Sequence, residues 1–202
     1  MIGIIDYKAG NARSVHYALT RLGVASDLAT TPAELAALDR IVLPGVGSAQ
    51  ATMDFLDESG CGDALEQRVR GDGVPFLGIC VGLQVLFDHS EEGNVKCLGW
   101  LPGQVKRFNE GLRVPQIGWN EVSVVTDDAL FAGWNHRHCY FVNSYYAAPD
   151  DVAVLAATAN YGREFTAAVR VDNITATQFH IEKSGPDGLE LLQRWAQEPT
   201  PC

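Results

Sequence analysis

Residues 75–84 read Pro75-Phe76-Leu77-Gly78-Ile79-Cys80-Val81-Gly82-Leu83-Gln84, and the rest of the chain is organised around this stretch. The apolar run before Cys80 has the length of a short buried strand, and Leu83, Leu86 and Phe87 follow it at helical spacing. Glycines stand two residues before and two after Cys80, where a strand that turns sharply into a helix leaves no room for a Cβ atom. The pattern predicts an elbow with Cys80 at a helix N-terminus, which favours a thiolate. By itself it fits a buried cysteine in a glycine-rich turn equally well.

A second stretch, residues 175–184 (TATQFHIEKS), contains partners for a cysteine nucleophile. It begins as a strand, and if that strand continues far enough, His180 and Glu182 point to the same face, because side chains two residues apart do so. A cysteine nucleophile needs a general base, and the base needs an acceptor that fixes its orientation. Cys80, His180 and Glu182 can fill these roles in that order. The alternative is a surface histidine and glutamate beside a basic patch, and the two stretches together favour the triad.

Composition narrows the class of protein. A chain of 202 residues, 47% hydrophobic and 20% charged, suits one globular α/β domain with a sizeable core. The net charge of −10 argues against a nucleic-acid or anionic-membrane surface, and no apolar run approaches the roughly 18 residues of a membrane span. Residues 1–7 read as a core strand and lack the basic region of a signal peptide. We therefore expect no nucleic acid and no membrane among the partners.

The cysteines do not form a recognisable framework. Their count is odd and no two have C-x-x-C spacing: Cys61, Cys80, Cys97, Cys139 and Cys202. This pattern indicates neither a set of disulfides nor a zinc site, and it favours the reducing cytoplasm. Residues 135–139 (NHRHC) hold two histidines and a cysteine, but these are crowded and no second cluster accompanies them. We expect no metal and no other cofactor in this chain.

Strand and helix patterns alternate over the first half of the chain. Strands are predicted at 2–5, 24–28, 40–43 and 75–79, and helices at 12–22, at a short segment that starts at 31, and within 48–72. A last helix is predicted near the other end of the chain, at 186–196. Asn11 can cap the first of these helices. The alternation indicates a parallel sheet covered on both faces, with functional loops at the carboxyl ends of the strands. Residues 98–177 read instead as hairpins or mixed sheet. The carboxylates of Asp88, Glu91 and Glu92 are expected to be solvated, without a catalytic role.

Several segments resemble a known enzyme family. The elbow GICVGLQ (78–84) and the segment FHIEKSG (179–185) are similar to class I glutamine amidotransferases. The resemblance narrows to the glutaminase subunit of imidazole glycerol phosphate synthase, the HisH family, when five further segments are added: Ile5–Asn11, Leu43–Ser48, Val114–Asn120, Tyr140–Tyr145 and Phe165–Val169. It extends from Met1 to about Trp195, which is nearly the whole chain.

The resemblance implies a fold, an activity and a partner. The fold is α/β, a three-layer flavodoxin-like sandwich whose mainly parallel central sheet has antiparallel additions and carries the nucleophile elbow. One glutamine amidotransferase domain spans residues 1–202, and the tail from about 198 to 202 is expected to be disordered. The implied activity hydrolyses glutamine to glutamate and ammonia through a cysteine thioester. The implied partner is a cyclase subunit, a (β/α)8 barrel, which forms a heterodimer with the chain and uses the ammonia in histidine biosynthesis.

The motifs assign roles to single residues. Cys80 is the nucleophile, His180 the acid and base, and Glu182 the acceptor that orients it. The oxyanion hole is expected from backbone N–H groups of Val81 and of the turn that contains Val46 and Gly47. Gln84 lies one helical turn after Cys80 and can face the same pocket. The resemblance implies that the substrate is contacted by Gly45, Gln84, Tyr140, Ser144 and Tyr145. It also implies that the partner docks near Asn11, Trp119 and Lys183.

Three residues depart from the family pattern. Ile181 follows the histidine where proline is usual, and Gln116 and Asn143 stand where histidines are common. These departures leave open a paralogous glutaminase that feeds ammonia to another synthase, in sugar or antibiotic biosynthesis. A cysteine peptidase or esterase of similar architecture is a second alternative, but such an enzyme does not need Gln84 or the segment 141–146 (FVNSYY). A non-catalytic protein that kept the fold is disfavoured by the intact triad.

Overall fold

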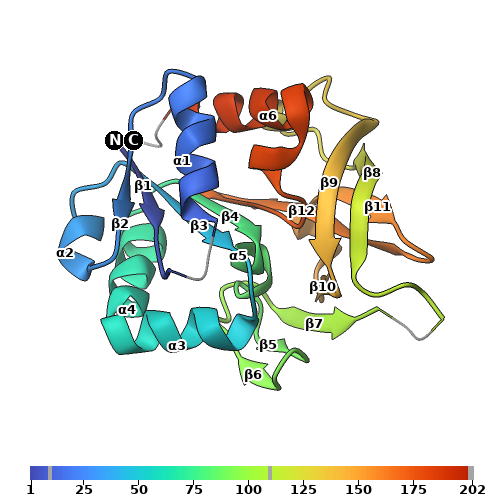
Figure 1. The fold of residues 1–202 in the computed structure, drawn as a ribbon, viewed down its shortest axis with the longest axis horizontal. Coiled ribbons are helices and arrows are strands. Elements are labelled where there is room, and N and C mark those ends of the chain that lie inside the picture. Colours follow the sequence, from blue (N-terminus) through green and yellow to red (C-terminus); the bar gives the residue numbers. More distant parts are fainter. Residues whose placement is uncertain (9–10, 109–110, 200–202) are drawn as a thin grey trace.

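The computed structural model describes residues 1–8, 11–108 and 111–199, and it is built on a nine-stranded sheet (Figure 1). The strand order is β2-β1-β3-β4-β13-β12-β11-β8-β9. The first five strands in this order run parallel: β2 (Ser26–Ala29), β1 (Ile2–Ile5), β3 (Arg40–Gly45), β4 (Phe76–Cys80) and β13 (Ile174–Thr177). The other four extend the sheet in antiparallel fashion: β12 (Glu164–Val171), β11 (Leu155–Asn160), β8 (Gln116–Val124) and β9 (Arg137–Asn143). The predicted α/β class, a mainly parallel sheet with antiparallel additions, is confirmed.

Helices and a small second sheet cover the two faces of the main sheet. Figure 1 shows α1 (Ala12–Arg21) and α6 (Gly185–Gln197) on one side, and α3 (Ala49–Ser59) and α4 (Cys61–Glu66) on the other. The second sheet lies beside α3 and has four strands: β10 (Tyr145–Pro149), β7 (Gly103–Arg107), β5 (His89–Ser90) and β6 (Val95–Lys96). The shorter elements are α2 (Pro32–Leu35), α5 (Val81–Gln84), a π-helical turn at Gln67–Gly71, and 3-10 turns at Ala129–Phe131, Val152–Val154 and Ile181–Lys183.

The core follows from the apolar pattern. Every residue of β1, β3 and β4 is buried, as expected for parallel strands covered on both faces. From one side α1 buries Val15 and Leu19 against them, and α6 buries Leu192 and Trp195. No helix in the described part of the chain is long and apolar enough to cross a membrane. The three layers bring the carboxyl ends of β3, β4 and β13 to one edge of the sheet, where the candidate residues lie.

The helix after the elbow is shorter than its apolar spacing predicts. It ends at Gln84, although Leu86 and Phe87 continue the helical pattern. The backbone carbonyl of Leu86 accepts hydrogen bonds from the N–H groups of Trp100 (2.8 Å) and Leu101, and that of Phe87 accepts one from Gly99 (2.9 Å). The segment that leads to β7 therefore takes acceptors that a longer helix needs, and the apolar side chains remain buried without helical backbone.

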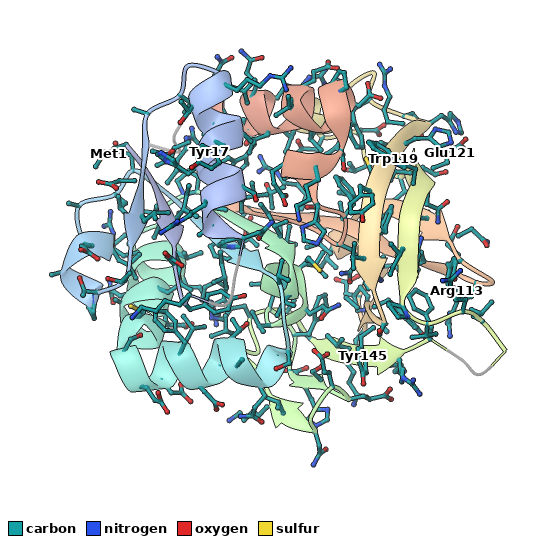
Figure 2. All side chains as sticks on the ribbon, viewed as in Figure 1. Met1, Tyr17, Arg113, Trp119, Glu121 and Tyr145 are labelled. Atoms are coloured by element: carbon teal, nitrogen blue, oxygen red, sulfur yellow. The ribbon has the colours of Figure 1, made fainter. Side chains whose placement is uncertain are left out.

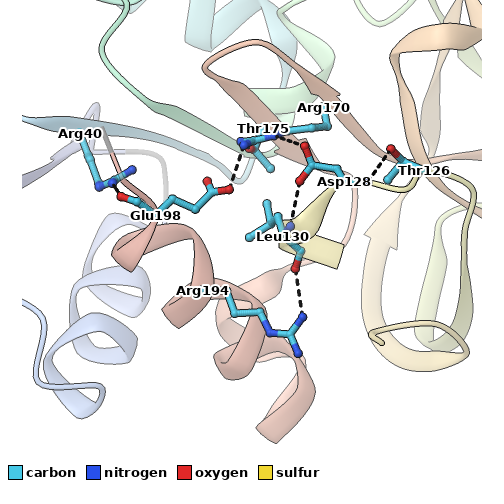
Figure 3. Close-up of polar contacts among 8 residues, drawn as sticks. All are labelled: Arg40, Thr126, Asp128, Leu130, Arg170, Thr175, Arg194 and Glu198. Atoms are coloured by element: carbon cyan, nitrogen blue, oxygen red, sulfur yellow. Dashed lines mark hydrogen bonds and ion pairs between the residues drawn. The ribbon is translucent and has the colours of Figure 1, made fainter. Parts of the chain in front are cut away.

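The C-terminal end of α6 is tied to the sheet edge opposite the candidate residues (Figure 3). The guanidinium of Arg170 pairs with Glu198 (2.9 Å) and with Asp128 (3.2 Å), and Arg40 donates to the backbone carbonyl of Glu198. Glu198, the first residue of the tail for which disorder is expected, is thus held by polar contacts. Residues 200–202 of that tail lie outside the described residues.

Candidate active site

Cys80 occupies a sharp turn between β4 and α5. Its backbone has φ 56° and ψ −104°, a conformation that L-residues rarely adopt and that only a well-packed surrounding maintains. A Cβ atom on Gly78 would lie 2.4 Å from the carbonyl oxygen of Gly82, and one on Gly82 would lie 2.0 Å from that of Leu43. Both positions therefore require glycine, because the close atoms belong to backbone. This is the elbow geometry that the sequence predicts.

His180 and Glu182 meet by a different route from the one expected. Strand β13 ends at Thr177, and the two residues lie on a turn that continues into the 3-10 helix Ile181–Lys183. The condition for strand alignment, that the strand continues as far as these two residues, is not met, because the chain leaves the sheet before His180. The turn brings His180 Nδ1 to 3.0 Å from Glu182 Oε1. The backbone N–H of His180 donates to the carbonyl of Tyr140 (2.9 Å) on β9, so the main chain that carries the ring is fixed as well.

The pKa of His180 reflects two opposing effects. Burial disfavours the charged imidazolium, but the hydrogen bonds and charges of Cys80 and Glu182 outweigh burial and raise the pKa of His180 to about 10. The Glu182 side chain is fully buried beside the ring. A protonated imidazole next to Cys80 favours a thiolate, which is the form in which cysteine acts as a nucleophile.

Asn11 belongs to this group as well as to the start of α1. It stands at the N-cap position predicted for it, but its side chain forms no capping hydrogen bond. Its Nδ2 instead donates to Glu182 Oε1 and lies 3.4 Å from His180 Nδ1. The sequence suggested a docking role for Asn11, and the structure adds a direct contact with the carboxylate that orients His180.

A cavity of about 230 Å³ opens at Cys80 and His180. Nine of the residues that the sequence singled out line it: Gly45, Val46, Gly47, Cys80, Val81, Gln84, Ser144, Tyr145 and His180. Tyr140 is not among the described residues that line it; its ring contacts Trp119 edge-on, with centroids 6.0 Å apart. Four further residues complete the lining: Glu92, Pro115, Val142 and Asn143. The volume suits a small molecule, which would lie against the sulfur atom of Cys80.

The Gly45–Gly47 turn lies directly against the elbow. The register of β3 and β4 pairs Gly45 with Cys80, and a Cβ atom on Gly45 would lie 2.4 Å from the Cβ of Val81. Gly47 has φ 125°, which favours glycine. The backbone of this turn and the backbone of Val81 therefore approach the same corner of the cavity, where oxyanion donors are needed.

Glu92 is a cavity residue for which the sequence predicted no role. Its Oε2 accepts a hydrogen bond from the backbone N–H of Ala49 (3.0 Å) at the start of α3, and its side chain reaches the cavity wall. The neighbouring carboxylates are also bonded, because Asp88 accepts from the N–H of Gly103 (2.9 Å) and Glu91 from that of Arg107 (2.8 Å). Asp88 and Glu91 are exposed, as the prediction of solvated charge requires, whereas Glu92 is half-buried and lines the cavity, so the prediction is wrong for Glu92. Twelve positions and a change of sheet separate Glu92 from Cys80, and no local pattern marks it.

Gln178 is a second residue that the sequence left without a role. Its side chain is fully buried, its Nε2 lies 3.6 Å from Cys80 Sγ, and its Oε1 accepts from Gln84 Nε2 (3.0 Å). Gln84 also donates to the backbone carbonyl of Tyr145 (3.0 Å). Both amide hydrogens of Gln84 are thus used within the protein, and its Oε1 remains for a ligand in the cavity.

The three departures from the family pattern lie close to the site. Gln116 and Asn143 face each other in the β8–β9 pair, and both are buried. Asn143 donates to the backbone carbonyl of Tyr145 (2.9 Å) and lines the cavity. Ile181 is buried and does not prevent the 3-10 turn that carries Glu182. None of the three disrupts the hydrogen bond between His180 and Glu182.

An exposed apolar strip adjoins the cavity mouth. On one face of the β8–β9 pair, Ile117 pairs with Val142 and Trp119 with Tyr140. Ile117 and Trp119 are 62% and 57% exposed, and Val142 also lines the cavity. Figure 2 shows Trp119 standing on this pair of strands. Lys183, which follows Glu182 directly, is exposed. An apolar surface of this kind is typical of a docking site.

Comparisons with known proteins agree with this architecture. The family described as "Glutamine amidotransferase class-I" matches residues 3–198. The chain is 48% identical to the imidazole glycerol phosphate synthase subunit HisH of Herpetosiphon aurantiacus, over 98% of this chain and 94% of that one. It is 45% identical to the HisH subunit of Methanothermobacter thermautotrophicus, over 98% of each. It also matches the chloroplastic imidazole glycerol phosphate synthase hisHF of Arabidopsis thaliana at 44%, over all of this chain and 35% of that protein.

Solved structures support the same fold. A crystal structure of a glutamine amidotransferase superposes with a TM-score of 0.77 at 21% identity, covering 96% of each chain. The structure of PurLQS from Thermotoga maritima gives a TM-score of 0.73 at 18% identity, covering 96% of this chain and 95% of that one. At these identities the structures show the fold, while the sequence relatives show the family. The chain belongs to the class I glutamine amidotransferases and, within them, to the family of HisH subunits of imidazole glycerol phosphate synthase.

Proposed function

We propose that this chain is the glutaminase subunit of an imidazole glycerol phosphate synthase, which releases ammonia from glutamine for histidine biosynthesis. The observation that carries the proposal is the placement of His180, which Glu182 holds at 3.0 Å and which shares the lining of one small cavity with Cys80. The raised pKa of His180 supports it. The partner is a cyclase subunit of the (β/α)8-barrel type, and the exposed strip of Ile117, Trp119 and Val142 supports a docking face at the cavity mouth. The buried, unpaired thiols of Cys61, Cys80, Cys97 and Cys139 are consistent with a cytoplasmic setting.

The triad performs the reaction in two halves. Cys80 Sγ attacks the side-chain carbonyl carbon of glutamine, and the carbonyl oxygen becomes an oxyanion. The C–N bond then breaks while His180 gives its proton to the leaving nitrogen, which releases ammonia and leaves a thioester. Water attacks the thioester and passes a proton to His180, and the C–S bond breaks to give glutamate and the thiolate. Glu182 stabilises the imidazolium at the beginning and end of the cycle.

Backbone groups stabilise both oxyanions in this proposal. The N–H of Val81 follows the nucleophile, and the turn with Val46 and Gly47 lies across the same corner of the cavity. Gly45 lets that turn approach, because any larger residue would collide with Val81. The backbone of Ser144 and Tyr145 forms the opposite wall, where it faces the amino-acid end of glutamine.

The experiment that tests the function measures glutamate release from glutamine by the purified chain. The chain is assayed alone and with a cyclase subunit of imidazole glycerol phosphate synthase loaded with its nucleotide ligand, and Cys80→Ala serves as the control. We expect strong stimulation by the cyclase subunit and loss of all activity in Cys80→Ala. Hydrolysis that depends on Cys80 but does not respond to the cyclase subunit would assign the ammonia to another synthase. Peptide cleavage without glutamate release would favour a cysteine peptidase.

Glu92 provides a test of the substrate's orientation. We propose that its carboxylate and Gln84 Oε1 accept hydrogen bonds from the α-ammonium group of glutamine, since both reach the cavity and neither is a donor there. Glu92→Gln keeps an acceptor for Ala49 but removes the charge, and we expect KM for glutamine to rise about tenfold with a smaller change in kcat. Glu91→Gln is the matched control, because Glu91 is outside the cavity lining. Equal KM values in the two variants would contradict this orientation.

A further inference from the structure

We propose that Gln178 is a further residue of the catalytic machinery, which donates a hydrogen bond to the thiolate of Cys80 and holds Gln84 in the orientation that binds substrate. The inference rests on the proposed function, because it takes Cys80 as the nucleophile. Gln178 is fully buried and does not line the cavity, so it reaches Sγ from inside the protein, whereas glutamine approaches from the cavity.

The position of Gln178 is fixed by backbone contacts. Its N–H donates to the carbonyl of Ala167 (2.8 Å) on β12, just past the end of β13. The hydroxyl of Thr177 donates to the carbonyl of Phe179 (2.9 Å), which closes the turn around Gln178. Because this turn leaves the sheet beside the elbow, the Gln178 side chain ends 3.6 Å from Cys80 Sγ, within the range of an N–H···S hydrogen bond.

A backbone carbonyl determines which end of each amide faces the sulfur. Tyr145 C=O can only accept, and it lies 3.0 Å from the amide nitrogen of Gln84, so Gln84 must present Nε2 there. The same Nε2 lies 3.0 Å from Gln178, which must therefore present Oε1 to Gln84. The remaining end of the Gln178 amide is Nε2, and it faces Cys80 Sγ. Reversing either amide would bring two acceptors or two donors together.

A donor at this place favours the reactive form of the cysteine. Hydrogen bonds to an ionised acceptor are stronger than those between neutral groups, so the amide of Gln178 stabilises the thiolate more than the thiol. Unlike His180, the amide has no proton to transfer and keeps its hydrogen bond throughout the cycle. It therefore assists attack by orienting Sγ, and it assists the second half of the reaction when negative charge returns to sulfur as the C–S bond breaks.

The test compares Gln178→Met with Thr175→Val in the full chain. Methionine has a similar length but no donor, whereas Thr175 is a buried residue of β13 that is outside the cavity lining and whose hydroxyl accepts from Arg170. Alkylation of Cys80 by iodoacetamide is followed by mass spectrometry across pH, together with kcat and KM for glutamine. In Gln178→Met we expect the midpoint of the alkylation profile to rise by about one pH unit and kcat to fall about tenfold. Thr175→Val should leave the profile unchanged.

Gln178→Glu keeps the inference testable if the methionine variant does not fold. Glutamate retains the acceptor for Gln84 but replaces the donor to Sγ with oxygen, so the alkylation midpoint should again rise. If a folded variant at position 178 has an unchanged midpoint of Cys80 alkylation, and Cys80→Ala abolishes glutaminase activity, the inference is overturned. If Cys80→Ala retains that activity, the proposed function itself fails, and the two failures are thereby distinguished.

Discussion

His180 shows at the scale of one residue how burial and pairing compete for a proton. Burial acts to lower its pKa, whereas Cys80 and then Glu182 act to raise it, and the result is a pKa of about 10. Cys80→Ala removes the larger of the two favourable partners and leaves the ring buried. We therefore expect the pKa of His180 to fall in Cys80→Ala, and to fall by less in Glu182→Gln, when its imidazole signals are titrated by NMR. A His180 pKa that is unchanged in Cys80→Ala would contradict the thiolate–imidazolium pair.

Residue identity alone could predict part of this site. The triad could be predicted because its cysteine stands in a glycine-flanked elbow, and its histidine and glutamate stand close together in one short segment. Gln178 and Glu92 could not be found in this way, since Gln178 contacts Gln84 across 94 positions and Glu92 is positioned by the start of α3. Their roles depend on hydrogen bonds between elements that are distant in sequence, and one sequence contains no record of such pairs.

The elbow is the element on which the site depends most. A Cβ atom on Gly82 would lie 2.0 Å from the carbonyl oxygen of Leu43, so Gly82→Ala must separate α5 from β3. We expect Gly82→Ala to lower the free energy of unfolding by about 3 kcal/mol, measured by urea denaturation, and to abolish glutaminase activity. Gly62→Ala is the matched control. Gly62 lies in helix α4, and a Cβ atom on it would lie 3.3 Å from the carbonyl oxygen of Leu56. The free energy of unfolding is therefore expected to change by about 1 kcal/mol at most. Similar stabilities for the two variants would contradict the account of the elbow.

Helices and strands were predicted well where the sequence pattern that determines them lies within the element itself. The elbow strand and its turn follow from glycine spacing and an apolar run, and both are present. The end of β13 could not be predicted, because the β-rich composition continues to Phe179 while the chain leaves the sheet and His180 bonds with β9. Likewise, α5 ends early because a segment 14 residues downstream takes the carbonyl of Leu86. In both cases a tertiary hydrogen bond overrides the periodic pattern.

At the scale of the whole molecule, the cavity opens onto the surface expected to meet the partner. The apolar strip of Ile117, Trp119 and Val142 borders the cavity, so a subunit docked on it would cover the place where ammonia leaves Cys80. Lys183 is exposed and shares the 3-10 turn with Glu182. Docking and catalysis are therefore connected through one short segment of backbone.

Lys183 tests this connection. Its backbone N–H donates to the carbonyl of His180 (2.9 Å), so a partner carboxylate that pairs with its ammonium group would also restrain the turn that holds His180 and Glu182. We expect Lys183→Ala to lower glutaminase activity in the presence of the cyclase subunit about two- to fivefold, which is the size of one exposed ion pair, and to leave basal activity nearly unchanged. Lys96→Ala, on the exposed face of β6 in the small sheet, is the matched control and should affect neither activity. Raising the salt concentration should reduce stimulation of the unmodified chain more than that of Lys183→Ala, because the variant lacks this ion pair. Equal losses of basal and stimulated activity in Lys183→Ala would show that Lys183 supports the site itself and does not couple it to the partner.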